Sequence, residues 1–182
     1  NGGAGLDTAN YATATTGVVA SLTSSLLPFQ TGDAQGDRFN NIENLTGSDH
    51  NDALFGDSGD NILTGGAGED AVDGMGGHDH LDGGLGNDTI YASTGTADLP
   101  ALIEGGDGED TLVLQGLVDG GNYDLTPLAN VTDNIETLDI RDGVNSEIRI
   151  SAADVQNIVD NSYASQLTIL ADDGDILTFT PD

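Results

Sequence analysis

Glycine and aspartate recur at fixed spacing in the middle of the chain, in a pattern suited to binding a hard cation. Five nonapeptides run without a gap over residues 47–91, and their first residues are Gly47, Gly56, Gly65, Gly74 and Gly83. The sixth residue of each has a short side chain ending in oxygen: Asp52, Asn61, Asp70, Asp79 and Asp88. Such oxygens are ligands that Ca²⁺ prefers, and glycine lets backbone carbonyl groups crowd around an ion. The pattern therefore predicts a row of calcium sites.

The eighth residue of each nonapeptide is hydrophobic, which connects this chemistry to a fold. These residues are Leu54, Leu63, Val72, Leu81 and Ile90. A flexible, acidic, glycine-rich linker gives no reason for hydrophobic residues to keep such a register. One inward side chain suits a strand of about three residues, and a single repeat cannot bury a core, whereas stacked repeats can. The sequence therefore predicts a solenoid of short strands.

The charge of the chain restricts its partners. Its 182 residues include 32 acidic and 3 basic ones, so the formal net charge is −29. Binding of nucleic acid or of an anionic membrane surface needs basic residues, so we expect neither. Self-repulsion opposes a compact state, and a divalent cation is the natural means of neutralising it. The sequence has no cysteine and no apolar run of transmembrane length, so we expect no membrane span.

The repeat block resembles the RTX family of secreted bacterial proteins. This resemblance implies an all-β fold, a right-handed parallel β-roll or β-solenoid, in which two nonapeptides make one turn. It also implies that each Ca²⁺ lies between repeats i and i+2. The earlier repeat supplies the carbonyl groups of its second and fourth residues, and the later repeat those of its first and third residues. Both repeats contribute the side chain of their sixth residue.

Applied to this sequence, the resemblance implies about five Ca²⁺ ions. Two sites join Asp52 to Asp70 and Asp70 to Asp88, with carbonyl groups from Ser48, His50, Gly65 and Ala67 at the first and from Gly66, Gly68, Gly83 and Leu85 at the second. On the opposite side Asn61 joins Asp79, with carbonyl groups from Asp57, Gly59, Gly74 and Gly76. Less regular sites join Asp7 to Asp52, Glu43 to Asn61 and Asp88 to Asp110, and the remaining candidate ligands are Gly47, Asp49, Gly84, Gly86, Gly105 and Asp107.

The segments on either side of the array share one plan, which divides the chain into residues 1–46, 47–113 and 114–182. In each flank an isolated repeat is followed by a β-rich, hairpin-like excursion, over residues 11–37 and 114–131. A matching pentapeptide then follows, Asn41-Ile42-Glu43-Asn44-Leu45 in one flank and Asn134-Ile135-Glu136-Thr137-Leu138 in the other. We expect both flanks to continue the parallel solenoid with metal-free turns.

The C-terminal segment predicts a cap for the solenoid. Residues 151–159 indicate a short helix, because Ser151 and Asp154 are spaced as in a capping box and the apolar residues share one face. Residues 167–170 and 175–179 predict strands. This tail resembles segments near the C-termini of large adhesins that leave bacteria by type I secretion. We expect the chain to be a piece of such a longer protein.

No catalytic constellation emerges, so we expect this chain not to be an enzyme. His78 and His80 flank Asp79, but both fall at positions that should point outward. The leading hypothesis is a monomeric calcium-binding module of a bacterial adhesin, exported unfolded by type I secretion machinery and located outside the cell or on its surface. The alternatives are the C-terminal accessory module of a secreted protease, lipase or alginate epimerase, and a calcium-dependent peptide- or glycan-binding module built from the excursions.

Overall fold

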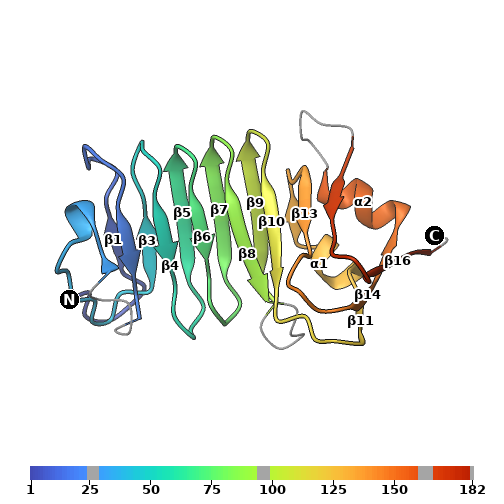
Figure 1. Ribbon diagram of the computed structural model, residues 1–182. Coiled ribbons are helices and arrows are strands. Elements are labelled where there is room, and N and C mark those ends of the chain that lie inside the picture. Colours follow the sequence, from blue (N-terminus) through green and yellow to red (C-terminus); the bar gives the residue numbers. More distant parts are fainter. Residues whose placement is uncertain (24–28, 94–98, 160–165, 181–182) are drawn as a thin grey trace.

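Two parallel sheets face each other along an elongated roll, with the chain ends at its opposite ends (Figure 1). The computed structural model describes residues 1–23, 29–93, 99–159 and 166–180. In the central array the chain alternates between the two sheets, because consecutive strands belong to different sheets and each pairs with the next strand but one. The fold is therefore an all-β parallel β-roll.

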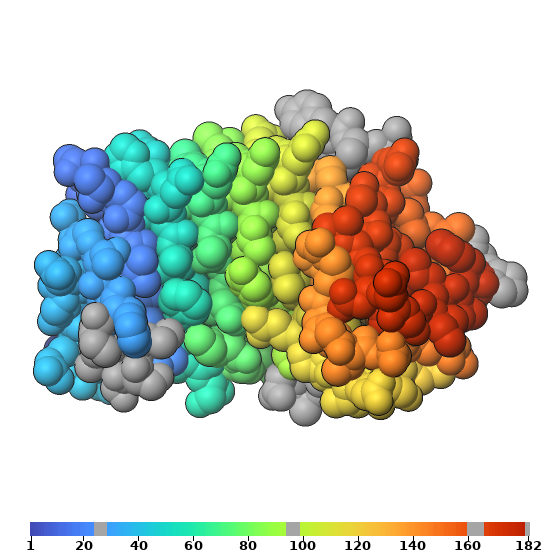
Figure 2. All heavy atoms as spheres, in the orientation of Figure 1, coloured from blue at the N-terminus to red at the C-terminus, as the bar shows by residue number. Residues whose placement is uncertain are grey.

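The first sheet, called sheet A, has six strands in the order β1, β3, β5, β7, β9 and β12 (Thr8–Asn10, Asn44–Thr46, Ile62–Ala67, His80–Leu85, Leu102–Asp107 and Thr132–Asp133). Sheet B, on the other side, has seven strands in the order β2, β4, β6, β8, β10, β13 and β15 (Val19–Ser21, Ala53–Phe55, Ala71–Asp73, Thr89–Ser93, Thr111–Gln115, Thr137–Asp139 and Thr168–Leu170). Both sheets extend beyond the nonapeptide array at each end, so successive turns lie side by side along the whole roll (Figure 2).

The core lies between the sheets and consists of the predicted inward column. Pairing of β4 with β6 and of β6 with β8 aligns Leu54 with Val72 and Val72 with Ile90. In sheet A, Leu63 pairs with Leu81 in the same way. All five of these side chains are fully buried. The eighth position of the repeat therefore sets the register, since a shift by one residue would turn every one of these side chains outward.

A third parallel sheet and two helices close the C-terminal end. Sheet C contains β11, β14 and β16 (Gly121–Asp124, Ser146–Ser151 and Ile176–Thr180). The helices are α1 (Thr126–Ala129) and α2 (Ala152–Ile158). The predicted capping box is confirmed, because Ser151 Oγ accepts a hydrogen bond from Asp154 N at 3.1 Å and Asp154 Oδ2 accepts one from Ser151 N at 2.8 Å. The two predicted C-terminal strands are also confirmed, but they join different sheets. None of the described helices is long and apolar enough to cross a membrane.

In the part of the chain that the structure describes, the excursions do not form regular hairpins, and both continue the parallel stacking. Strand β2 pairs in parallel with β4, and β11 pairs in parallel with β14. An antiparallel bridge between Val19 and Thr31 is a hairpin-like feature of the first excursion, which also contains the short 3₁₀ helix η2 (Gly32–Ala34). Parallel pairing prevails because it brings Ala20 on β2 and Val18, which precedes this strand, into the core, where both are fully buried.

Truncation of single leucines on β7 tests which side chains of this strand point into the core. Leu81 is fully buried on β7, whereas Leu85 at the end of the same strand is 56% exposed. We expect Leu81→Ala to lower the free energy of unfolding in saturating Ca²⁺ by about 2–5 kcal/mol. Leu85→Ala, the control, should change it by less than about 0.5 kcal/mol. Urea denaturation followed by circular dichroism measures both, and equal losses would contradict the inward and outward assignment.

Candidate metal-binding ladders

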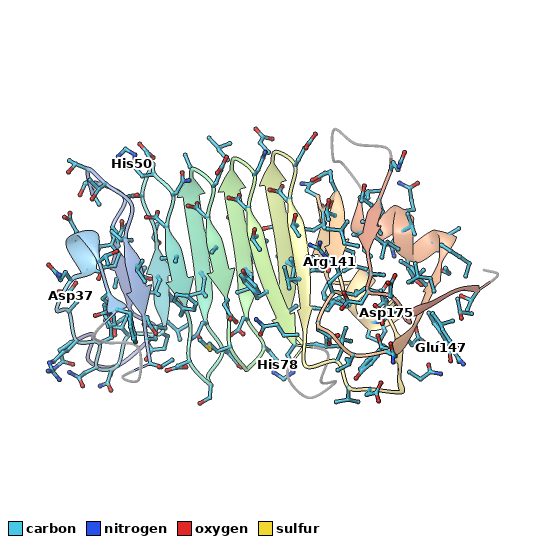
Figure 3. The ribbon with its side chains drawn as sticks, in the orientation of Figure 1. Asp37, His50, His78, Arg141, Glu147 and Asp175 are labelled. Atoms are coloured by element: carbon cyan, nitrogen blue, oxygen red, sulfur yellow. The ribbon has the colours of Figure 1, made fainter. Side chains whose placement is uncertain are left out.

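The side chains at the sixth position line up in two columns, one beside each sheet. Ladder B, which precedes the strands of sheet B, consists of Asp52, Asp70, Asp88, Asp110 and Glu136. Ladder A, which precedes the strands of sheet A, consists of Asp7, Glu43, Asn61 and Asp79. Parallel stacking places each residue directly above its counterpart in the next turn. Figure 3 shows the turns at opposite edges of the roll, marked by His50 and His78.

In ladder B, one carboxylate oxygen of each residue is used to hold the previous turn. The Oδ1 atoms of Asp70, Asp88 and Asp110 accept hydrogen bonds from the backbone N–H groups of Asp52, Asp70 and Asp88 at 2.7, 2.8 and 2.8 Å. Glu136 Oε2 accepts from Asp110 N at 2.7 Å. The ladder is therefore continuous from the first nonapeptide to the C-terminal flank, and every step joins a side chain to a backbone donor.

The second carboxylate oxygen is buried without a partner in the middle of this ladder. The Oδ2 atoms of Asp70, Asp88 and Asp110 have no hydrogen bond, although these residues are at most 2% exposed. A Cβ atom on Gly65 would overlap with both Asp70 Oδ2 and the carbonyl oxygen of Gly83. Carboxylate and carbonyl oxygens from successive turns thus converge on the space that the missing side chain leaves. An unpaired buried carboxylate oxygen is costly, and oxygen atoms without a donor are what Ca²⁺ requires.

Burial makes these carboxylates hard to ionise when no cation is present. Desolvation is the main cause that raises the pKa of Asp70 to about 7, and the charges of Asp88 and Asp52 add to it. Desolvation also raises the pKa values of Asp79, Asp88 and Asp110 to about 6. Hydrogen bonds from the backbone oppose the shift in each case without cancelling it. A bound divalent cation would favour the ionised form and remove this cost.

Ladder A is built in the same way but carries less charge. Asp79 Oδ1 accepts from Asn61 N at 2.9 Å, and Glu43 Oε2 accepts from Asp7 N at 2.9 Å. Asn61 uses its amide as a connector, since Nδ2 donates to the carbonyl oxygen of Glu43 and Oδ1 accepts from Asp57 N, both at 2.8 Å. Beyond Asp79 the ladder meets Ala101, which has no side-chain oxygen and whose N–H donates to the Asp79 carbonyl at 2.7 Å.

Most of the predicted pairs are neighbours in the structure. Asp52 is joined to Asp70, Asp70 to Asp88, Asp88 to Asp110, Asn61 to Asp79 and Glu43 to Asn61. The expected pairing of Asp7 with Asp52 is wrong. Strand β1 pairs with β3, so Asp7 lies beside Glu43, and the neighbour of Asp52 is Val18, whose N–H donates to Asp52 Oδ1 at 2.6 Å. The first excursion supplies its own turn and displaces Asp7 to the other ladder.

The carbonyl groups proposed as ligands also lie between successive turns. Ser48 O accepts from Ala67 N at 3.1 Å, and Leu85 O accepts from Gly68 N at 2.8 Å. The side chains of Asp49 and Asp107 are exposed at the tips of the turns. No group of three or more His, Cys, Asp or Glu side chains among the described residues is arranged to hold a metal. A cation in either ladder would need backbone carbonyl groups among its ligands, and the assignment of those groups stays a prediction.

Two glutamates of the ladders have neighbours in the structure that the sequence did not predict. Glu136 continues ladder B beyond Asp110, and Glu43 stands opposite Asp7 rather than only beside Asn61. The signal was present in the sequence as the shared pentapeptide of the two flanks. The predicted outward positions of the histidines are consistent with the structure, in which His78 is exposed and His80 Nε2 lies 3.2 Å from Glu104 Oε2 on the outer face of sheet A.

A parallel β-roll with oxygen-lined turns defines a calcium-binding solenoid, and comparison with known families agrees. Residues 46–81 and 64–96 match the family described as the RTX calcium-binding nonapeptide repeat (4 copies). The segment from residue 46 to residue 96 therefore belongs to the RTX family of calcium-binding repeats. No curated protein matches the chain.

The amide of Asn61 generates a prediction about affinity. Asn61→Asp adds a charged ligand to ladder A, which should tighten the weakest Ca²⁺ step by roughly tenfold. Without Ca²⁺ the new carboxylate would face the carbonyl oxygen of Glu43, 2.8 Å from the present amide nitrogen, so the metal-free fold should be less stable. Calorimetric titration with Ca²⁺ measures the affinity. Asn51→Asp adds the same charge at an exposed position and should leave the affinity nearly unchanged; equal effects of the two substitutions would refute the assignment of Asn61.

The raised pKa values predict an inverted pH dependence in the absence of Ca²⁺. The folded, metal-free state holds protons on Asp70 up to about pH 7 and on Asp79, Asp88 and Asp110 up to about pH 6, whereas the unfolded chain loses them near pH 3.8. The folded state therefore binds more protons, and its stability should increase as the pH falls from about 7 towards 4. Circular dichroism of calcium-free protein should show more β structure at pH 5 than at pH 8. Constant or lower β content at pH 5 would contradict the prediction.

Proposed function

We propose that the protein is a structural module of a secreted or cell-surface bacterial adhesin, and that calcium drives its folding outside the cell. The observation that carries this proposal is the row of buried carboxylate oxygens without partners in ladder B. RTX calcium-binding repeats occupy the centre of the chain, and calcium is the cation that fits these oxygens. The resemblance of the tail to the C-terminal regions of large adhesins supports this kind of parent protein over a secreted enzyme.

The charge explains why folding should wait for export. About five Ca²⁺ ions would add roughly ten positive charges, about a third of the net charge of −29, at the points where carboxylates are closest. Calcium sites of extracellular modules have dissociation constants of about 10⁻⁴–10⁻³ M. Such sites remain empty in the cytosol, so the chain would pass the type I secretion machinery unfolded and fold where Ca²⁺ is abundant. Binding free energy then appears as folding free energy.

The module acts by itself as a monomeric spacer or cap, without catalysis. A second candidate function, calcium-dependent binding of a peptide or glycan, is favoured by two open clefts at the ends of the excursions. One cleft of about 300 Å³ has Tyr11 and Asp37 on its wall, and the other, of about 320 Å³, has Ala129 and Val131. A peptide and glycan array probed in Ca²⁺ and in chelator tests this function. Binding that is lost on Tyr11→Ala would favour it.

Removal of calcium tests the main proposal directly. In chelator at pH 8 we expect the array to be disordered, because five inward side chains do not offset the entropy of the chain. The circular dichroism spectrum should then be largely that of a disordered chain. Addition of Ca²⁺ should restore the β spectrum and a cooperative thermal transition. Mg²⁺ should restore much less, since it demands a smaller octahedral site and gives up water reluctantly. A full β spectrum and a cooperative transition in chelator would show that the fold does not need calcium and would overturn the proposal.

A further inference from the structure

The two Asn-Ile-Glu elements perform the same structural task at the two ends of the array. Each element follows an excursion and places its glutamate in a ladder. Glu43 Oε2 accepts from Asp7 N at 2.9 Å, and Glu136 Oε2 accepts from Asp110 N at 2.7 Å. One element leads into sheet A and the other into sheet B, so the similarity is a property of the element rather than of one location.

The asparagine of each element takes over a role that glycine has in the array. Asn41 and Asn134 have φ angles of 52° and 54°, in the left-handed region. Their carbonyl oxygens lie so close to Gly2 and Gly105 that a Cβ atom on either glycine would overlap with them. In the array this place is filled by the carbonyl oxygen of the position-one glycine two repeats later, in the adjacent turn of the roll. The position-one glycines do not have positive φ angles, so the asparagines present the same oxygen from a different backbone conformation. Asparagine is one of the few residues that tolerate that conformation.

At each junction between the array and a flank, a carboxylate oxygen is buried without a hydrogen-bond partner. Asp110 is 0% exposed, its Oδ2 has no hydrogen bond, and a Cβ atom on Gly105 would lie 2.6 Å from it. Asp7 Oδ2 is likewise buried without a partner, and so is the side-chain oxygen of Asn134. In the described residues the ion pairs formed by Arg and His side chains involve neither Asp110 nor Glu136. Above the raised pKa of Asp110, where its carboxylate is ionised, a cation would compensate this set of buried oxygens.

We propose that each Asn-Ile-Glu element completes a further Ca²⁺ site at the junction between the array and its flank. At the C-terminal junction the ligands are Asp110 Oδ2, the carbonyl oxygen of Asn134 and the carboxylate of Glu136. At the N-terminal junction they are the corresponding atoms of Asp7, Asn41 and Glu43. Both sites lie outside residues 46–96, which match the RTX repeats. The inference rests on the proposed calcium binding of the array and extends it to turns without the nonapeptide pattern.

The C-terminal site would connect calcium binding to the folding of the tail. Glu136 is 7% exposed and lies next to Ile135, whose N–H donates to the carbonyl oxygen of Ile158 at the end of α2, at 3.1 Å. An ion held by Glu136 would therefore fix the turn on which this helix rests. Calcium in the last turn of the array would therefore add to the stability that the tail gains from its own packing.

A substitution that keeps the hydrogen bond and removes the charge shows whether Glu136 binds Ca²⁺ or only accepts a hydrogen bond. Glu136→Gln retains an oxygen that can accept from Asp110 N. If Glu136 binds Ca²⁺, the variant should bind one ion fewer at 1 mM Ca²⁺, by metal analysis of the dialysed protein, or bind that ion at least about tenfold more weakly in calorimetric titration. Glu109→Gln removes the same charge from an exposed residue next to Asp110 and serves as the matched control. Identical titrations of the two variants would overturn the inference.

Two further variants keep the result unambiguous. Asp70→Asn weakens a site inside the array, so a wild-type protein that binds no Ca²⁺, or an Asp70→Asn variant that titrates like wild type, would count against the proposed function itself. A clear effect of Asp70→Asn together with no effect of Glu136→Gln would overturn only the junction sites. If Glu136→Gln fails to fold in saturating Ca²⁺, Glu43→Gln decides the matter at the other junction, where loss of one ion supports the inference and an unchanged count refutes it.

Discussion

The structure depends on a conflict between stacking and charge. Parallel pairing places identical positions of successive turns one strand spacing apart, about 4.8 Å, so a repeat that contains one aspartate generates a column of aspartates. Asp52, Asp70, Asp88 and Asp110 form such a column. The backbone N–H of the preceding turn satisfies one oxygen of each carboxylate but cannot neutralise its charge. The second oxygens of Asp70, Asp88 and Asp110 are buried without a partner. A divalent cation can compensate them while the carboxylates stay ionised.

Hydrophobic burial cannot resolve this conflict, because the central turns have too little of it. Each nonapeptide contributes one fully buried apolar side chain, such as Val72 or Ile90. The C-terminal flank is richer, since Ile148 and Ile150 are both buried on the single strand β14 and α2 adds Ile158. Stability is therefore distributed unevenly along the roll. The flank can hold itself together by packing, whereas the array relies on ions, and the ladder residues at the junctions join the two kinds of turn.

The regular part of this arrangement could be predicted from the sequence, and the irregular part could not. A strict period fixes a spacing of 18 residues between ladder neighbours such as Asp52 and Asp70, and with it the register and the inward column. The capping box of α2 is similarly local. Insertions lengthen the spacing to 22 residues between Asp88 and Asp110 and to 26 between Asp110 and Glu136. Nothing in the sequence of an excursion states which strand it will pair with, so the partner of Asp7 and the existence of sheet C depend on tertiary contacts.

The Asn-Ile-Glu elements show how a flank can continue the turns of a repeat array beyond its last aspartate. A glycine-rich turn presents carbonyl oxygens because glycine adopts positive φ freely, but it contributes no side chain to a core. In Asn134-Ile135-Glu136 these tasks are divided: asparagine adopts the left-handed conformation, isoleucine is fully buried, and glutamate reaches the ladder. The turn therefore gains a hydrophobic anchor while keeping oxygens towards Asp110. A flank built in this way can stay attached to the array by packing and can still sense, through the shared carboxylates, whether the array is loaded.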